Sequence, residues 1–175
     1  MVLRGKIKRL CLDAVLLSLS LVLSYLEAIL PITLLIPLPG FKLGLANIIV
    51  TMAFVTVSPY DAAAISLCRI CIMALLFGNA QSFFFSLCGG LLSYAGLWLL
   101  VRLGKRFFSI VGVSVGCAAL HNLGQLTAAA ILFTTDVILG YLPALLIAAL
   151  IFGSLTGMLL KLILPRFEGL VGKGH

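Results

Sequence analysis

The run GYLPALLIAALIFGSLTGMLLKLIL, which covers residues 140–164, decides the class of fold. Lys161 is its single charged residue. The run is longer than the roughly 20 apolar residues that a helix needs to cross a bilayer. Because a spanning segment has to satisfy its own backbone hydrogen bonds, the run predicts a transmembrane helix. Pro165 is expected to end this helix, because proline cannot donate to the preceding turn.

The whole chain has the same apolar character. Of its 175 residues, 63% are hydrophobic and 10% are charged, and the mean hydropathy is +1.29. A soluble domain is only about half apolar. We therefore expect one integral membrane domain over residues 1–175, with the lipid bilayer as its solvent and no separate soluble domain.

Prolines, glycines and short polar segments divide the chain into six predicted helices. Pro31 and the prolines that follow it make a helix-hostile loop, and Ser58-Pro59 and Gly78-Asn79 mark two further breaks. The expected fold is an all-α membrane protein, a bundle of six transmembrane helices. The predicted ranges are about 9–30, 41–57, 60–77, 82–101, 109–133 and 140–164.

The basic residues predict the orientation of this bundle. Ten of them fall on one side of a six-span arrangement: Arg4, Lys6, Lys8, Arg9, Arg102, Lys105, Arg106, Lys161, Arg166 and Lys173. An excess of Lys and Arg in short loops marks the cytoplasmic side, so both termini are expected in the cytoplasm. The net charge of +7 then reflects membrane topology and requires no nucleic-acid partner.

Polar residues gather toward the outer half of the expected bundle. Those near the outer face are Glu27, Lys42, Asn47, Asn79 and Gln81, and those deeper in the membrane are Arg69, His121, Asn122 and Gln125. A charged group at the centre of a spanning helix costs a few kcal/mol on insertion scales, so Arg69 should face a cavity, a carboxylate or a bound anion.

Two interpretations of these polar residues remain open at this point. Arg69 could form a structural bridge to Glu27, and His121 with its neighbours could hold helices together. The alternative is a pocket that opens to the outside and is lined by all nine residues. The cationic groups and hydrogen-bond donors would suit a small anionic or strongly polar organic molecule.

The sequence contains no recognisable catalytic motif. We find no paired carboxylates, no glycine-rich phosphate loop ending in Lys-Ser or Lys-Thr, and no His and Cys cluster at zinc spacing. The five cysteines all lie within apolar runs and are interpreted as small buried hydrophobic residues. The sequence thus predicts a protein that is not an enzyme and has neither a cofactor nor a metal site.

Small residues recur four positions apart, which lets helix backbones approach closely. The pairs are Ala14 and Ser18, Ser20 and Ser24, Gly112 and Gly116, and Gly153 and Gly157. The glycine pairs are interpreted as internal packing. The small residues of the first helix could instead face an external partner.

Three segments resemble a known family. They are Glu27-Ala28 before the proline-rich loop, residues 39–48 (PGFKLGLANI) and residues 121–125 (HNLGQ). Together they resemble a bacterial membrane family labelled either "Gx transporter" or "heptaprenyl diphosphate synthase component I". That family is similar to the substrate-binding S components of energy-coupling factor (ECF) transporters, which are six-helix proteins with both termini inside.

The resemblance implies a function and partners. It implies uptake of a vitamin-like or precursor molecule at a bacterial cell membrane, powered by a membrane scaffold subunit and two cytoplasmic ATPases. Ala14 and Ser18 match the position of a docking motif on the first helix, with serine replacing the second alanine. The nine polar residues would then be substrate-binding.

The enzyme label of the family implies an alternative function. Prenyl diphosphate synthases bind magnesium diphosphate through clustered aspartates, since Mg²⁺ prefers oxygen ligands. The three aspartates Asp13, Asp61 and Asp136 are expected to be isolated from one another. The alternative is therefore a non-catalytic membrane accessory of isoprenoid or quinone (heptaprenyl diphosphate) biosynthesis.

Overall fold

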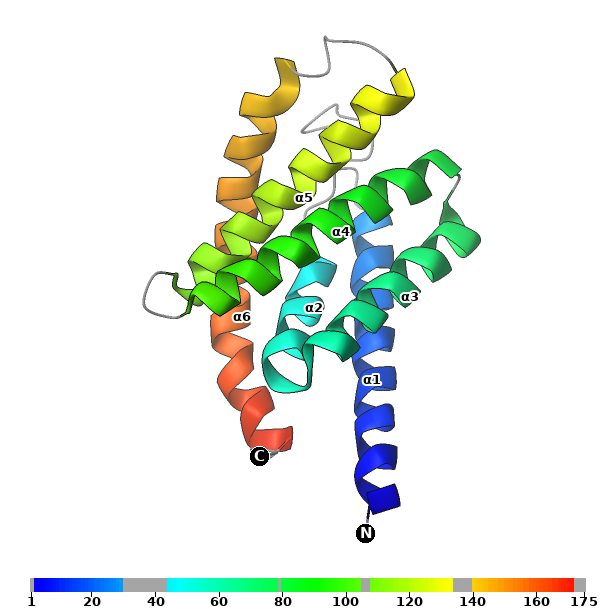
Figure 1. Ribbon diagram of the computed structural model, residues 1–175, viewed down its shortest axis with the longest axis vertical. Helices are drawn as coiled ribbons and strands as arrows, with labels where there is room; N and C mark the ends of the chain where they lie inside the picture. The colour runs from blue at the N-terminus through cyan, green and yellow to red at the C-terminus, as the bar shows by residue number, and fades with distance from the viewer. Residues whose placement is uncertain (1, 30–43, 79, 105–107, 134–139, 172–175) are drawn as a thin grey trace.

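The computed structural model describes residues 2–29, 44–78, 80–104, 108–133 and 140–171, which form six α-helices (Figure 1). Their bounds are α1 Val2–Ile29, α2 Leu45–Thr56, α3 Pro59–Phe77, α4 Ala80–Leu103, α5 Ile110–Phe133 and α6 Leu142–Val171. Within these residues, five helices are long and apolar enough to cross a membrane, and the sixth, α2, has only 12 residues. The all-helical class is confirmed, and the chain is a multi-pass membrane protein.

The short helix α2 lies among the others and packs against α1, α3 and α6 (Figure 1). At 1.5 Å per residue it is about 18 Å long, whereas the hydrocarbon core of a bilayer is roughly 30 Å thick. Eight of its twelve residues are buried. The predicted range was 41–57. Residues 41–43 lie outside the described residues, and Gly44 has a left-handed φ of 81°, so the helix begins at Leu45.

Helix α3 starts and ends within a residue of its predicted range. The side chain of Ser58 accepts a hydrogen bond from the Tyr60 amide at 3.2 Å, and Pro59 occupies the first turn. Both features are preferred at helix starts. At the other end Gly78 is extended, and a Cβ there would lie 2.9 Å from the Cα of Ala74.

The prediction that Pro165 ends the last helix was wrong. Helix α6 continues through Pro165 to Val171. Proline removes one donor from the helix interior, but the turns beyond it are stabilised by Phe167, which packs against the core. Helix α1 is also longer than expected, because it begins at Val2 instead of residue 9.

Helices α4, α5 and α6 form the most closely packed part of the molecule. A Cβ at Gly124 of α5 would lie 2.5 Å from the carbonyl oxygen of Cys88 in α4. On α6, a Cβ at Gly153 or Gly157 would lie 2.7 or 2.8 Å from an α5 backbone atom. The Gly153 and Gly157 pair therefore serves internal packing, as predicted, because only glycine allows this separation.

The first and last helices place the two ends of the chain at the same end of the molecule (Figure 1). Helix α1 starts there and α6 finishes there. The bidentate ion pair between Arg9 and Asp61 joins α1 to the start of α3, with Nε–Oδ2 and Nη2–Oδ1 distances of 2.7 and 2.9 Å.

Candidate ligand-binding site

Arg69 is the central residue of the candidate site. It lies on α3, and only 8% of its surface is exposed. Its Nη1 donates to the Ser24 hydroxyl of α1 at 3.2 Å, and its Nη2 donates to the Asn47 Oδ1 of α2 at 3.5 Å. Among the described residues, its buried Nε has no hydrogen-bond partner. Arg69 thus joins three helices and keeps one donor unused.

Glu27 lies beside this arginine. It is only 6% exposed, because it shares the core-facing side of α1 with Leu16 and Ser20, which precede it by eleven and seven residues. One of its oxygens accepts a hydrogen bond from the amide of Gly44, at the start of α2. Its charge acts on the Arg69 guanidinium. The acid therefore links the end of α1 to the start of α2, and its negative charge interacts favourably with Arg69 without an ion pair between the two described side chains.

His121, Asn122 and Gln125 form a second polar group, on α5. All three are buried, with 4–7% of their surfaces exposed. A Cβ at Gly89 of α4 would lie 2.9 Å from His121 Cε1 and 3.0 Å from Gln125 Cγ, so these side chains pack against α4. Asn122 Nδ2 donates to the Leu145 carbonyl oxygen of α6 at 2.9 Å. These contacts hold α4, α5 and α6 together.

The remaining predicted site residues lie apart or outside the described residues. Gln81 is exposed at the start of α4. Lys42 and Asn79 lie outside the described residues, so their predicted roles stay predictions. The structure therefore brings together Glu27, Asn47 and Arg69 from the predicted set.

Three small cavities lie near the Arg69 cluster, which we define as Ser24, Glu27, Asn47 and Arg69. Asn47 lines two of them, of about 20 and 10 Å³. Ser24 lines the third, of about 80 Å³, between α1, α3 and α4. The cluster thus lies next to cavities whose walls include polar side chains, and each of the two cavities at Asn47 has room for about one water molecule.

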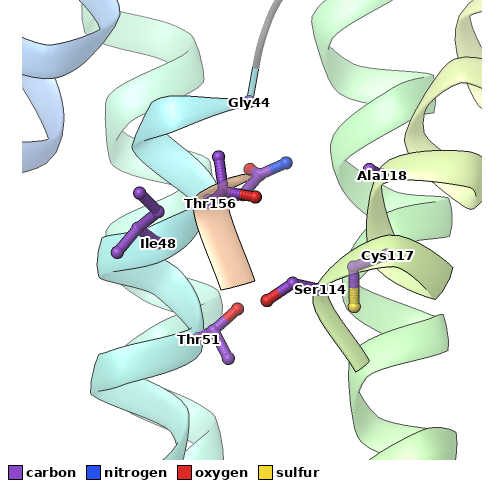
Figure 2. A pocket seen from close by; sticks show the side chains of 8 residues that line it. Gly44, Ile48, Thr51, Ser114, Cys117, Ala118 and Thr156 are labelled. Atoms are coloured by element: carbon purple, nitrogen blue, oxygen red, sulfur yellow. The ribbon is translucent and has the colours of Figure 1, made fainter. Parts of the chain in front are cut away.

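The hydroxyl groups that line the cavities at Asn47 were not among the predicted site residues. The first cavity is lined by Gly44, Asn47, Ile48, Thr51, Ser114, Cys117, Ala118 and Thr156 (Figure 2). The second adds Ser66, Ser93 and Tyr94. Thr51 follows Asn47 by four residues, so both lie on one face of α2. That spacing was the available signal, but Ser and Thr are common wherever membrane helices pack.

Ala14 and Ser18 lie on the outside of the molecule. Both are exposed, and the Ser18 hydroxyl donates to the Ala14 carbonyl oxygen at 2.8 Å. At about 100° per residue they lie opposite the core-facing side of α1. The pair is thus not used for packing within the described part of the chain, and its role in docking stays a prediction.

Asp13 and Asp61, which were expected to be isolated, lie at the same junction of α1 and α3 but make no direct contact with each other among the described interactions. Arg9 and Asp13 lie four residues apart on the face of α1 that meets the start of α3. Asp61 accepts both hydrogen bonds from Arg9, and Asp13 is close enough for its charge to interact with Asp61. Asp136 lies outside the described residues. Among the described residues, no group of three or more His, Cys, Asp or Glu side chains is placed to hold a metal ion.

Comparison with known protein families shows which family the chain resembles. The model of the family "heptaprenyl diphosphate synthase component I" matches residues 16–163, which include α2, α3, α4 and α5 and the polar residues described above. The comparisons with curated proteins and with solved structures found no similar protein. Since the match covers most of the sequence, the chain belongs to the heptaprenyl diphosphate synthase component I family.

Proposed function

We propose that this protein is the substrate-binding membrane subunit of an ECF-type uptake transporter. It would capture a small, polar or anionic vitamin-like or precursor molecule from the outside of a bacterial cell membrane. The observation that carries this proposal is the buried guanidinium of Arg69, whose Nε has no partner among the described residues. A buried, unused charged donor in a membrane helix is expected to serve a substrate or ion.

The electrostatics of the Arg69 cluster refine the class of ligand. Glu27 already lies close enough to act on Arg69, so the described part of the cluster holds one positive and one negative charge. A dianion would add two uncompensated charges to a site of low dielectric, which is costly. The cluster therefore disfavours a dianion and favours a ligand with a strongly polar neutral group, or with at most a single carboxylate directed at the unused Nε of Arg69.

The proposal includes partners that supply energy. The sequence has no phosphate-binding loop, so uphill transport would depend on a separate membrane scaffold subunit with two cytoplasmic ATPases. Ala14 and Ser18 support this part of the proposal, because they form a small-residue surface on the outer side of α1. In this proposal the protein itself is not an enzyme.

The test is purification from native membranes in mild detergent, followed by mass spectrometry of the proteins and the small molecules that remain bound. We expect a scaffold subunit, two ATPases and one retained polar molecule. Recovery of a soluble prenyltransferase, without ATPases or a retained small molecule, would contradict the transport proposal and support the accessory function in isoprenoid biosynthesis.

A further inference from the structure

A cavity lies between helices α1, α2 and α3 on one side and α4, α5 and α6 on the other, which we call the two halves of the molecule. We call it the seam cavity and define it by Asn47 and Thr51 of α2, Ser114 and Cys117 of α5, and Thr156 of α6 (Figure 2). Asn47 also accepts a hydrogen bond from Arg69. The seam cavity and the Arg69 cluster therefore share Asn47.

Two hydroxyl groups point into this cavity without protein partners. Thr51 is 95% buried, with 5% of its surface exposed, and among the described residues its hydroxyl makes no hydrogen bond. Ser114 is half-buried, and among the described residues its hydroxyl makes no hydrogen bond either. Figure 2 shows the two oxygens directed into the same space. A buried hydroxyl without a partner is destabilising, so an occupant that bonds to both would be favoured.

The walls determine the chemistry of this occupant. The residues that line the cavity carry no charge, and each serine or threonine hydroxyl can both donate and accept. Thr156 already donates to the Gly153 carbonyl oxygen at 3.1 Å, which leaves its oxygen able to accept. The volume of about 20 Å³ admits one group of the size of a water molecule.

We propose that the seam cavity binds one uncharged hydrogen-bonding group between Thr51, Ser114 and Thr156. A water molecule occupies it in the ligand-free protein. The second part of this inference rests on the proposed function. In it, a hydroxyl, carbonyl or amide group of the substrate replaces the water, and a carboxylate of the same molecule binds Arg69. The substrate class is thus a small monocarboxylate with a neutral polar group.

The test uses isosteric removal of the hydroxyls, with bulk water as the probe. Thr51→Val and Ser114→Ala are compared with wild type by thermal unfolding in detergent, after exhaustive washing has removed small molecules. The control is Thr56→Val, also on α2, whose hydroxyl bonds to the Met52 carbonyl oxygen of its own helix at 2.8 Å. If the cavity is occupied, Thr51→Val should lower the melting temperature by about 2–4 °C more than the control does. If the cavity is dry, Thr51→Val should leave the melting temperature unchanged or raise it, which would overturn the proposal.

A second experiment tests whether a substrate group, and not only water, occupies the seam cavity. Unwashed protein is analysed by mass spectrometry for the molecule that co-purifies with wild type. Lower retention by Thr51→Val and Ser114→Ala, with normal retention by Thr56→Val, supports the substrate subsite, and equal retention by all variants overturns it. Failure of the transport proposal looks different, because wild type then retains no molecule while the stability loss of Thr51→Val persists and still supports the water site.

Discussion

Arg69 shows how one residue can serve both structure and binding. Its Nη atoms bond to α1 and α2, which ties three helices together, while its Nε is left without a partner among the described residues. The structural contacts of Arg69 are hydrogen bonds to Ser24 and Asn47, whereas the expected bridge to Glu27 is not among the ion pairs of the described residues. The structural role and the binding role therefore both stay predictions for this side chain. They differ in what happens when the charge is removed, because a structural bridge affects folding and a ligand contact affects affinity.

Replacing Arg69 by Met retains the apolar bulk and removes the charge and donors. We expect the affinity for the co-purifying molecule to fall by about 1.5–3 kcal/mol, the range for a charge-assisted hydrogen bond. Lys42→Met should weaken binding less, since the sequence places Lys42 nearer to water, where charge interactions are screened. Arg102→Met is a matched control, because Arg102 stacks on Trp98 at 4.7 Å on α4. A variant Arg69→Met that binds normally but melts early would refute the binding role.

Glu27→Gln tests the structural interpretation. Glutamine can still accept the hydrogen bond from the Gly44 amide but no longer compensates the charge of Arg69. Leaving a buried charge without compensation is destabilising. We therefore expect a lower melting temperature in the ligand-free variant, measured by circular dichroism. Normal melting with altered affinity would instead place Glu27 among the ligand contacts.

At the scale of a single helix, α1 has a buried face and an exposed face. Leu16, Ser20 and Glu27 are buried on one side, whereas Ala14 and Ser18 are exposed on the opposite side. Lipid chains do not require small residues, but a neighbouring membrane helix does if the two backbones are to approach closely. The outer face of α1 is therefore the place to look for a partner subunit.

Tryptophan at position 14 or 18 should disrupt such a contact. We expect Ala14→Trp and Ser18→Trp to lower the amount of scaffold subunit that co-purifies by severalfold while ligand retention stays normal, because bulk separates the two helices. The control is Leu19→Trp, an exposed position about 100° around the helix from Ser18. Wild-type recovery of the scaffold with all three variants would exclude this face as the docking surface.

At the scale of the whole molecule, the short helix α2 distinguishes this fold from a regular bundle. Helices α4, α5 and α6 are joined by glycine contacts, and α1 and α3 pack on α2 at the other side. The polar cavities lie between these two halves. Helices α4, α5 and α6 pack closely, whereas small cavities remain where they meet α2 and α3. The candidate ligand-binding site therefore lies next to the less densely packed boundary between the two halves.

The orientation of the whole molecule is tested by cysteine labelling in a background without the five native cysteines. Labels at Lys6, Lys105 and Arg166 should react with an impermeant reagent only from the cytoplasmic side, and a label at Asp136 only from outside. The reason is the one-sided distribution of Lys and Arg. Reaction of the Lys105 position from outside would contradict the six-span topology.

Features that depend on residues close together in the sequence were predicted correctly, whereas features that depend on contacts between distant residues were not. The bounds of helix α3 were predicted within a residue, because Ser58, Pro59 and Gly78 start and end the helix through contacts with adjacent backbone groups. Pro165 was misjudged because Phe167 stabilises the turns beyond it through contacts with distant core residues. The ion pair between Arg9 and Asp61 was missed for the same reason, since α1 and α3 meet only in the folded chain.

By itself, the sequence determined that this protein is helical and resides in a membrane. Apolar runs of this length match the thickness of a bilayer, and only a helix satisfies their backbone hydrogen bonds there. The sequence also identified the polar residues that are expensive to bury. Only the tertiary structure decided how those residues group, with Arg69 among α1, α2 and α3 and His121 between α5 and α4. The physical reason is that the energy of a buried polar group depends on its partners, and these come from helices far apart in the sequence.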